Sequence, residues 1–141
     1  MRKWSAAVMM DRVCSKRYVL PPPREGGERY TVQRGDLIYN VVHPVHMDPK
    51  YYPNPEVFNP ERFSHENKKQ IQSFTFLPFG TGPRGCLGGR FSVLQMKVLI
   101  YHMALTFKLV KCGKTADPIE LEAHEIIISP RGGTWVCLEL R

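Results

Sequence analysis

The stretch FLPFGTGPRGCLGGRF, from Phe76 to Phe91, limits the possible folds of this chain more than any other segment. It holds five of the chain's eleven glycines around the single Cys86. Glycine is costly to order and is worth placing only where the backbone bends sharply or where another group approaches it closely. The stretch is therefore neither a regular helix nor a strand. We predict a loop that allows a large group to approach the cysteine.

A long helix is predicted directly after this loop, over about Gly89 to Leu109. Gln95, Lys97 and His102 interrupt the apolar run, which suits a helix buried in a protein better than one in a bilayer. Most of the remaining side chains are apolar as well, so we expect the helix to be nearly enclosed. The apolar residues at helical spacing are Phe91, Leu94, Val98, Tyr101, Leu105 and Leu109.

Prolines determine the segment before the loop. Five of them lie between residues 44 and 60, a density that forbids a long helix or an inner strand and predicts a meandering surface segment. Short strands are predicted at 13–14 and 18–20, with a hairpin partner at 29–33 and a third strand at 37–42. After the helix, strands are predicted at 125–129 and 134–140, joined as a hairpin by residues 130–133.

Size and charge exclude several classes of protein. At 141 residues and 16.3 kDa the chain is long enough for one domain with a core. Its net charge of +7 is scattered rather than clustered on one element, which argues against a nucleic-acid partner and favours an acidic protein or an anionic ligand. The four cysteines form no C-x-x-C pair, so neither a zinc cluster nor a dithiol redox site is expected. No signal peptide or membrane span is expected.

The surroundings of Cys86 indicate a metal-bound thiolate. The cysteine precedes the predicted helix by three residues, where free N–H groups and the positive end of the helix dipole stabilise an anion. The glycines would admit a flat, bulky group, Phe79 would pack beside the sulfur, and Arg84 would neutralise a carboxylate. Together these features describe a haem with its propionates. Three alternatives remain open, namely a buried inert cysteine, a phosphate-binding loop and a thiolate nucleophile. The stretch lacks the G-x-x-x-x-G-K-[ST] motif, which argues against the phosphate-binding loop.

The loop also resembles a known family. Phe79–Gly88 matches the F-x-x-G-x-R-x-C-x-G haem-thiolate signature of the cytochrome P450 monooxygenases at every fixed position. His46–Pro49, Tyr51–Pro55 and Phe58–Phe63 resemble the meander and the P-E-R-F motif of that family. The amino-acid sequence of these segments is most similar to that of insect microsomal members of the family, which oxidise toxins and other lipophilic molecules. The resemblance covers essentially the whole chain and implies a mainly α fold with small β-sheets.

The resemblance also implies which part of the family's fold is present. Residues 1–43 would be the end of the E-x-x-R helix and a small sheet, 44–75 the meander, 76–110 the ligand loop and its helix, and 111–141 a C-terminal hairpin. The chain would thus be the C-terminal quarter to third of a longer parent enzyme. The glutamate partner of Arg2, the membrane anchor and the distal helix would lie before Met1, so Arg2 without its glutamate should be a liability.

Residue roles follow from the same resemblance. Cys86 is expected to be the axial ligand of the iron of haem b, and no other residue of the chain is expected to be catalytic. Arg84 and Arg12 are expected to pair with the propionates, and Arg2 and Arg62 to belong to a structural ion network. Other cofactor contacts are expected from Phe79, Gly80 and Gly88, and substrate contacts from Ala6, Ala7, Val8, Met9, Glu125 and Ile126.

The implied activity is insertion of one oxygen atom from O₂ into a lipophilic small molecule. The electrons would come from NADPH–cytochrome P450 reductase, which Arg90 and Lys97 would face. The enzyme would lie at the cytosolic face of the endoplasmic reticulum membrane, attached only by the absent N-terminal anchor. The other cysteines, Cys14, Cys112 and Cys137, are expected to be reduced. The alternative is a non-catalytic or inert haem-binding fragment.

Overall fold

The computed structural model describes residues 1–124 and 127–141. In these residues the fold consists of a short helix, α1 (Val42–His46), a long helix, α2 (Gly89–Thr106), and four two-stranded antiparallel sheets. The small sheets agree with the predicted fold class. Helix is confined to these two elements and three short 3₁₀ turns, so the described residues themselves are not mainly α.

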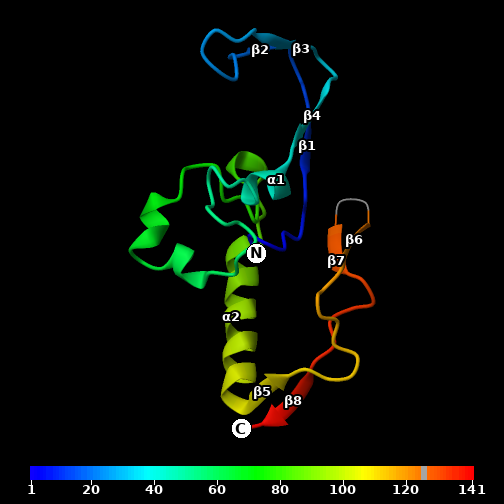
Figure 1. Cartoon of the computed structure of the whole chain (residues 1–141). Coiled ribbons are helices and arrows are strands. Elements are labelled where there is room, and N and C mark those ends of the chain that lie inside the picture. Colours follow the sequence, from blue (N-terminus) through cyan, green and yellow to red (C-terminus); the bar gives the residue numbers. More distant parts are fainter. Residues whose placement is uncertain (125–126) are drawn as a thin grey trace.

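The first two sheets form one long ribbon. Strand β1 (Met10–Val13) pairs with β4 (Leu37–Asn40), and between them the chain makes a hairpin of β2 (Tyr18–Leu20) and β3 (Tyr30–Val32). The predicted hairpin is therefore confirmed. The pairing of β1 with β4 had no signal in the sequence, because strand partners separated by a hairpin leave no local pattern. Figure 1 shows this ribbon extending away from α2.

The proline-rich segment is irregular, as predicted. Between residues 44 and 63 only the end of α1 and the 3₁₀ turn Pro60–Phe63 are helical, and no strand is present. The predicted strand at 37–42 ends earlier, at Asn40, because Val42 begins α1. Pro44 is tolerated there because it lies in the first turn of the helix, where an N–H group has no intrahelical partner.

Helix α2 begins where it was predicted and ends sooner. Phe107 adopts extended dihedral angles (φ −125°, ψ 150°), and the chain continues as β5 (Phe107–Val110). This strand pairs with β8 (Cys137–Leu140), with Phe107 opposite Leu140. The prediction of helix up to Leu109 is thus wrong, because pairing with a distant strand overrides the local helical spacing. The C-terminus consequently lies at the far end of α2 (Figure 1).

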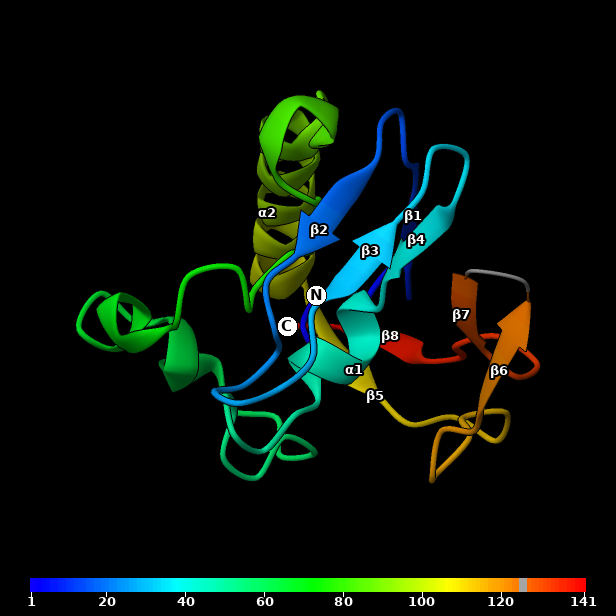
Figure 2. The same ribbon diagram turned by 90° about the horizontal axis from the view of Figure 1, so that it is seen from above.

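The predicted C-terminal hairpin is also different. Strand β6 (Leu121–His124) pairs with β7 (Ile127–Pro130), so the hairpin lies before the turn at 130–133 rather than across it. Gly132 (φ +71°) and Gly133 (φ +84°) bend the chain there, and the Trp135 indole N–H donates to the Gly132 carbonyl oxygen at 2.9 Å. The chain leaves this turn toward β5. Figure 2 shows β6 and β7 beside each other and β8 apart from them.

The small core lies between residues 2 and 77. Among the described residues, those that are buried all fall between positions 2 and 77, and none belongs to α2. The prediction of a nearly enclosed α2 is therefore wrong for these residues, because only β5 among the described elements packs substantially against it. The helical end expected at residues 1–4 is likewise not seen. In a helix the N–H groups of these residues would donate to carbonyl oxygens four positions earlier in the chain. The buried residues are Arg2, Ser5, Val32, Val42, His46, Tyr52, Thr75 and Leu77.

Candidate functional site

The cysteine loop holds Cys86 by its backbone and leaves its thiol exposed. The Cys86 N–H donates to the Phe79 carbonyl oxygen at 2.9 Å, which closes the loop, and the Cys86 carbonyl oxygen accepts from the Gly89 N–H at 3.4 Å. Inside the loop Gly82–Arg84 forms a 3₁₀ turn. Cys86 therefore lies three residues before the first residue of α2, at the N-terminal end of the helix.

Two of the glycines in this loop are required by packing. A Cβ on Gly80, which has φ +70°, would lie 3.0 Å from the Met10 sulfur, and one on Gly89 would lie 3.2 Å from the Phe79 ring. The Phe79 ring thus packs on the first residue of α2. By contrast, space is open around Gly82 (φ +72°), and Gly88 has only the Ser92 hydroxyl at 4.0 Å. The outer side of the loop is therefore bare backbone that a flat group can approach.

The fold brings Arg12 and Arg84 together. Met10 of β1 contacts Gly80, so β1 lies against the cysteine loop. Two residues further along β1, Arg12 lines one open hollow together with Arg84, and Asp11 and Val13 complete its lining, so that two guanidinium groups and one carboxylate face it. Both guanidinium groups are exposed, and Arg12 Nη1 donates to the Asp11 carbonyl oxygen at 2.6 Å. This hollow is a place where a group with two carboxylates can be paired.

These residues fit a haem. The donor set is an exposed thiol at a helix N-terminus, two exposed guanidinium groups on one hollow, and a glycine backbone open to a planar neighbour. A sulfur ligand for iron, cations for two propionates and an unobstructed surface for the ring are the features that such a cofactor requires. Leu87, the residue after the cysteine, is fully exposed.

Arg2 is buried and anchors the N-terminal segment to the meander. Its guanidinium donates to the carbonyl oxygens of His46 (2.7 Å) and Pro55 and lies 5.1 Å above the centre of the Tyr52 ring. Burial, with the positive charge of Arg62 as a second cause, lowers the pKa of Arg2. The carbonyls thus satisfy its hydrogen bonds without cancelling its charge.

Arg62 holds the same stretch of the meander from the other side. Its Nη2 donates to the Pro53 carbonyl oxygen at 2.6 Å and to the Asn54 carbonyl oxygen at 2.9 Å. Its Nε is buried with no hydrogen-bond partner among the described residues. The two arginines thus repel each other, Glu56 offsets part of the charge on Arg2, and Arg62 keeps one unused donor.

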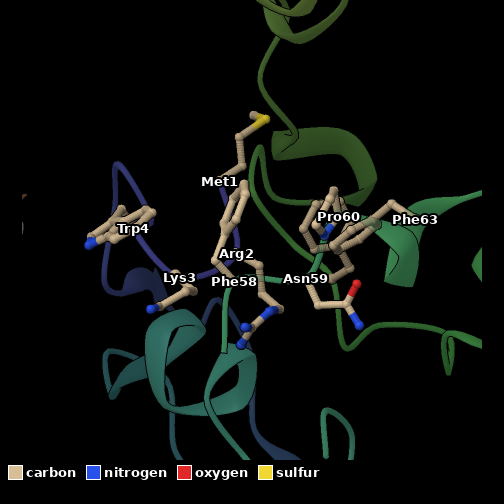
Figure 3. A pocket seen from close by; sticks show the side chains of 9 residues that line it. Met1, Arg2, Lys3, Trp4, Phe58, Asn59, Pro60 and Phe63 are labelled. Carbon is tan, nitrogen blue, oxygen red and sulfur yellow. The ribbon is translucent and has the colours of Figure 1, made fainter. Parts of the chain in front are cut away.

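Beside Arg2 lies an apolar hollow of about 330 Å³. Figure 3 shows the side chains of Met1, Phe58, Pro60 and Phe63 around it, with Arg2 at its edge. None of the predicted haem contacts lines this hollow. It is therefore a surface distinct from the predicted haem contacts, next to Arg2 and the start of the cysteine loop at Phe76.

His46 is a structural residue that sequence reasoning missed. It is fully buried, its Nε2 accepts the Leu77 N–H at 2.8 Å, and its Nδ1 lies 2.9 Å from the Ser5 hydroxyl. It thereby joins the N-terminal segment, α1 and the start of the cysteine loop. Burial lowers the pKa of His46 to about 4, with His43 as a lesser cause, so the ring is neutral. Its partners lie far away in the sequence, and no local signal identifies them.

The predicted substrate contacts remain predictions. Ala6 is exposed, whereas Ala7, Val8 and Met9 are half-buried, and the Val8 carbonyl oxygen accepts from the His43 N–H at 3.0 Å. This segment precedes β1, whose Arg12 lies near the loop. The other two predicted contacts, Glu125 and Ile126, lie outside the described residues.

Comparison with known proteins shows the family. The profile of the cytochrome P450 family matches residues 1–137. Over all 141 residues the chain is 43% identical to cytochrome P450 9e2 of Blattella germanica and 41% identical to probable cytochrome P450 9f2 of Drosophila melanogaster. Cytochrome P450 6k1 of Blattella germanica is 37% identical over 94% of the chain.

The chain therefore belongs to the cytochrome P450 family, and the resemblance to insect members is confirmed. Membership implies a haem cofactor. The chain covers 26%, 27% and 24% of the three relatives, that is, about a quarter of their length. What a protein of that full length does is a separate question.

Proposed function

We propose that these residues form the cysteine-ligand part of a haem-thiolate monooxygenase, with Cys86 as the axial ligand of haem b. The observation that carries the proposal is the exposed Cys86 at the N-terminus of α2, in an open glycine loop beside the hollow that Arg12 and Arg84 line. When bound, the haem supplies oxygen activation, for insertion of one oxygen atom from O₂ into a lipophilic small molecule.

The chain's own part is to bind and orient this cofactor. The hydrogen bond from the Cys86 N–H to the Phe79 carbonyl oxygen holds the backbone of the proposed ligand at the N-terminus of α2. Arg84 and Arg12 would pair with the two propionates. Gly80 and Gly88 keep the loop close to the ring, because neither presents a side chain.

Arg2 and Arg62 act as structural residues that share one carboxylate in the parent enzyme. The unused Arg62 Nε and the effect of Arg62 on the pKa of Arg2 support this assignment. A glutamate located two residues before Met1 in the family's motif would supply the missing charge. The network would hold residues 53–55, and through His46 the start of the cysteine loop.

The remaining assignments concern surfaces. We propose that the exposed Arg90 and Lys97 face an acidic NADPH–cytochrome P450 reductase, and that residues 6–9 and 125–126 contact the substrate. The proposed location is the cytosolic face of the endoplasmic reticulum membrane. Of the helices in the described part of the chain, none is both long and apolar enough to span a bilayer. The proposed membrane contact would come from an N-terminal anchor in the parent.

One observation favours a second candidate, an inert haem-binding fragment. Every residue of α2 is at least partly exposed, including Phe91 (69%), Leu94 (60%) and Ile100 (64%). A helix with so much solvent-exposed apolar surface needs further packing partners to be stable. The transcript sequence upstream of Met1 separates the two candidates, since an in-frame E-x-x-R glutamate supports the enzyme and a verified start at Met1 supports the fragment.

The ligand assignment is tested by Cys86→Ser in the haem-loaded parent enzyme. We expect the red-shifted Soret band of the reduced CO complex to disappear, because the sulfur ligand is lost. Cys14→Ser, which changes a cysteine remote from the loop in sequence, should leave the band unchanged. A band retained in Cys86→Ser would remove Cys86 as the ligand.

A further inference from the structure

The sheet formed by β5 and β8 brings two cysteines to the same place. Cys137, the first residue of β8, pairs with Val110 at the end of β5. Cys112 follows Val110 by two residues, and residues two apart along an extended chain lie on the same face. The register therefore places Cys112 diagonally across from Cys137, where side chains on one face of a sheet are neighbours. The sequence, with no C-x-x-C pair, gave no reason to expect a dithiol here.

Thr115 holds the two segments together. Its hydroxyl oxygen accepts from the Cys112 N–H at 2.8 Å and lies 2.7 Å from the Trp135 carbonyl oxygen. The Thr115 N–H in turn donates to the Cys112 carbonyl oxygen at 2.9 Å. One residue thus bridges the turn that carries Cys112 to the segment that leads into Cys137. The proximity of the thiols is therefore part of the fold.

The two sulfurs have complementary reactivity. The Thr115 hydroxyl, 3.5 Å from the Cys112 sulfur, lowers the pKa of Cys112, and the Lys114 N–H and Cys137 contribute further. Partial desolvation, followed by the hydrogen bond to Cys112, raises the pKa of Cys137. Cys112 is half-buried and Cys137 exposed, so small reagents can reach the pair. Cys112 is the better nucleophile, and Cys137 lies in place to react second.

We propose that Cys112 and Cys137 are a reversible thiol–disulfide pair whose oxidant is a low-molecular-weight disulfide such as glutathione disulfide. The Cys112 thiolate attacks one sulfur of glutathione disulfide, forming a mixed disulfide and releasing one glutathione thiolate, which takes a proton from solvent. The Cys137 thiol then loses its proton to solvent and attacks the Cys112 sulfur. This step forms the protein disulfide and releases the second glutathione thiolate, which is protonated in turn. Two protein thiols are oxidised and one glutathione disulfide is reduced to two glutathiones.

The bond would tie the end of β5 to the start of β8. It would close a loop over the intervening residues, which include β6 and β7. Cys112 lies beyond the end of β5 in a turn, so its backbone can make the small adjustment that disulfide geometry requires. The oxidised form should therefore hold the β5–β8 sheet more firmly than the reduced form does.

The test equilibrates the haem-loaded parent enzyme with glutathione buffers, traps free thiols by alkylation and maps disulfides by mass spectrometry. Trypsin cleaves after Lys111, Lys114, Arg131 and Arg141, so the linked product is Cys112–Lys114 joined to Gly132–Arg141. We expect this product at a glutathione disulfide to glutathione ratio at least about tenfold lower in the native protein than in the urea-denatured protein, because the fold holds the thiols together.

Two pairs of variants sharpen the result. Cys112→Ser should abolish the linked product and leave Cys137 at most glutathionylated, whereas Cys14→Ser should leave the product unchanged. Thr115→Val should slow its formation and Thr115→Ser should restore the rate, since the hydroxyl is the largest cause of the lowered pKa of Cys112. Equal ratios for native and denatured protein, or native oxidation that yields only mixed disulfides, would overturn the proposal.

Discussion

Two regions of the molecule are stabilised in different ways: residues 2–77, and the unit formed by α2, β5 and β8. The first region contains every buried residue among those described, and many of its anchors are polar: Arg2, Ser5, His46 and Thr75. The second contains the longest helix and a sheet, but no buried side chain. One region is held by hydrogen bonds to its own backbone, whereas the other exposes apolar side chains that remain without packing partners in these residues.

The difference shows how the cysteine loop is positioned. On its N-terminal side the loop is attached to the polar anchors, since His46 binds the Leu77 N–H and Met10 contacts Gly80. On its C-terminal side it continues into α2, whose position depends on surfaces beyond the described residues. The direction of the Cys86 sulfur is thus determined locally, and the stability of the helix behind it is not.

The largest expected effect concerns the chain expressed alone. We expect residues 1–141 neither to hold haem tightly nor to oxidise a substrate, and to aggregate or fold loosely. Leaving a few hundred Å² of apolar surface exposed to solvent costs about 25 cal/mol per Å², which amounts to several kcal/mol. This cost is comparable to the stability of a typical domain, about 5–15 kcal/mol. Haem stoichiometry, thermal melting and reductase-dependent turnover measure this. Stoichiometric haem with cooperative melting and turnover would contradict it.

Removing the central polar anchor should be the most damaging single change in the parent enzyme. His46→Ala leaves the buried Leu77 N–H without an acceptor and opens a cavity, and should lower the free energy of unfolding by about 3–5 kcal/mol. The control is His65→Ala, which changes an exposed histidine of the meander, with an expected effect within about 0.5 kcal/mol. Denaturant titration measures both, and a His46→Ala cost as small as that of the control would refute the anchor role.

A matched pair of leucines tests whether α2 is covered in the parent enzyme. Leu77 is 8% exposed and Leu94 60% exposed. Leu77→Ala should cost about 2–4 kcal/mol of unfolding free energy. If the rest of the parent covers α2, as we expect, Leu94→Ala costs a similar amount there. A cost below about 0.5 kcal/mol for Leu94→Ala would mean that the apolar face stays exposed.

The low pKa of His46 predicts a loss of stability in acid. In the unfolded chain the ring has its ordinary pKa of 6.5, and in the fold its pKa is about 4. Between these values the unfolded state binds more protons, so stability is complete above about pH 6.5 and falls as the pH drops toward 4, by about 3 kcal/mol in all. Urea unfolding of the parent across this range should show the slope. His46→Asn, which cannot titrate, should flatten it, and an unchanged slope would mean that other groups cause it.

The smallest effects are expected at the two exposed arginines. Arg84→Ala and Arg12→Ala should each weaken haem binding, by up to about fivefold for an exposed ion pair, with Arg84 the more severe because it lies in the loop itself. Transfer of haem from the parent enzyme to apomyoglobin measures the loss. Arg90→Ala, which changes an exposed arginine of α2, is the control. Unchanged haem retention in both variants would mean that the propionates are held elsewhere.

Much of the site was predictable because its signals are local. The glycines, Arg84 and Cys86 lie within one short segment, and the helix begins at Gly89 as its apolar spacing indicated. The β2–β3 hairpin and the irregular proline segment follow from short-range rules as well. The predictions that failed depend on partners far along the chain, namely the end of α2 at Thr106, the partner of β8 and the exposure of α2.

The sequence by itself determined the family and predicted Cys86 as the sulfur ligand, because motif spacing is a property of neighbouring residues. Only the tertiary structure decided that Arg12 joins Arg84, that His46 connects Ser5 to Leu77 and that Cys112 meets Cys137. Each of these contacts joins segments that the chain separates by many residues. Their formation depends on which strands pair and which polar groups must find partners once they are buried, and neither is encoded in any single stretch of sequence.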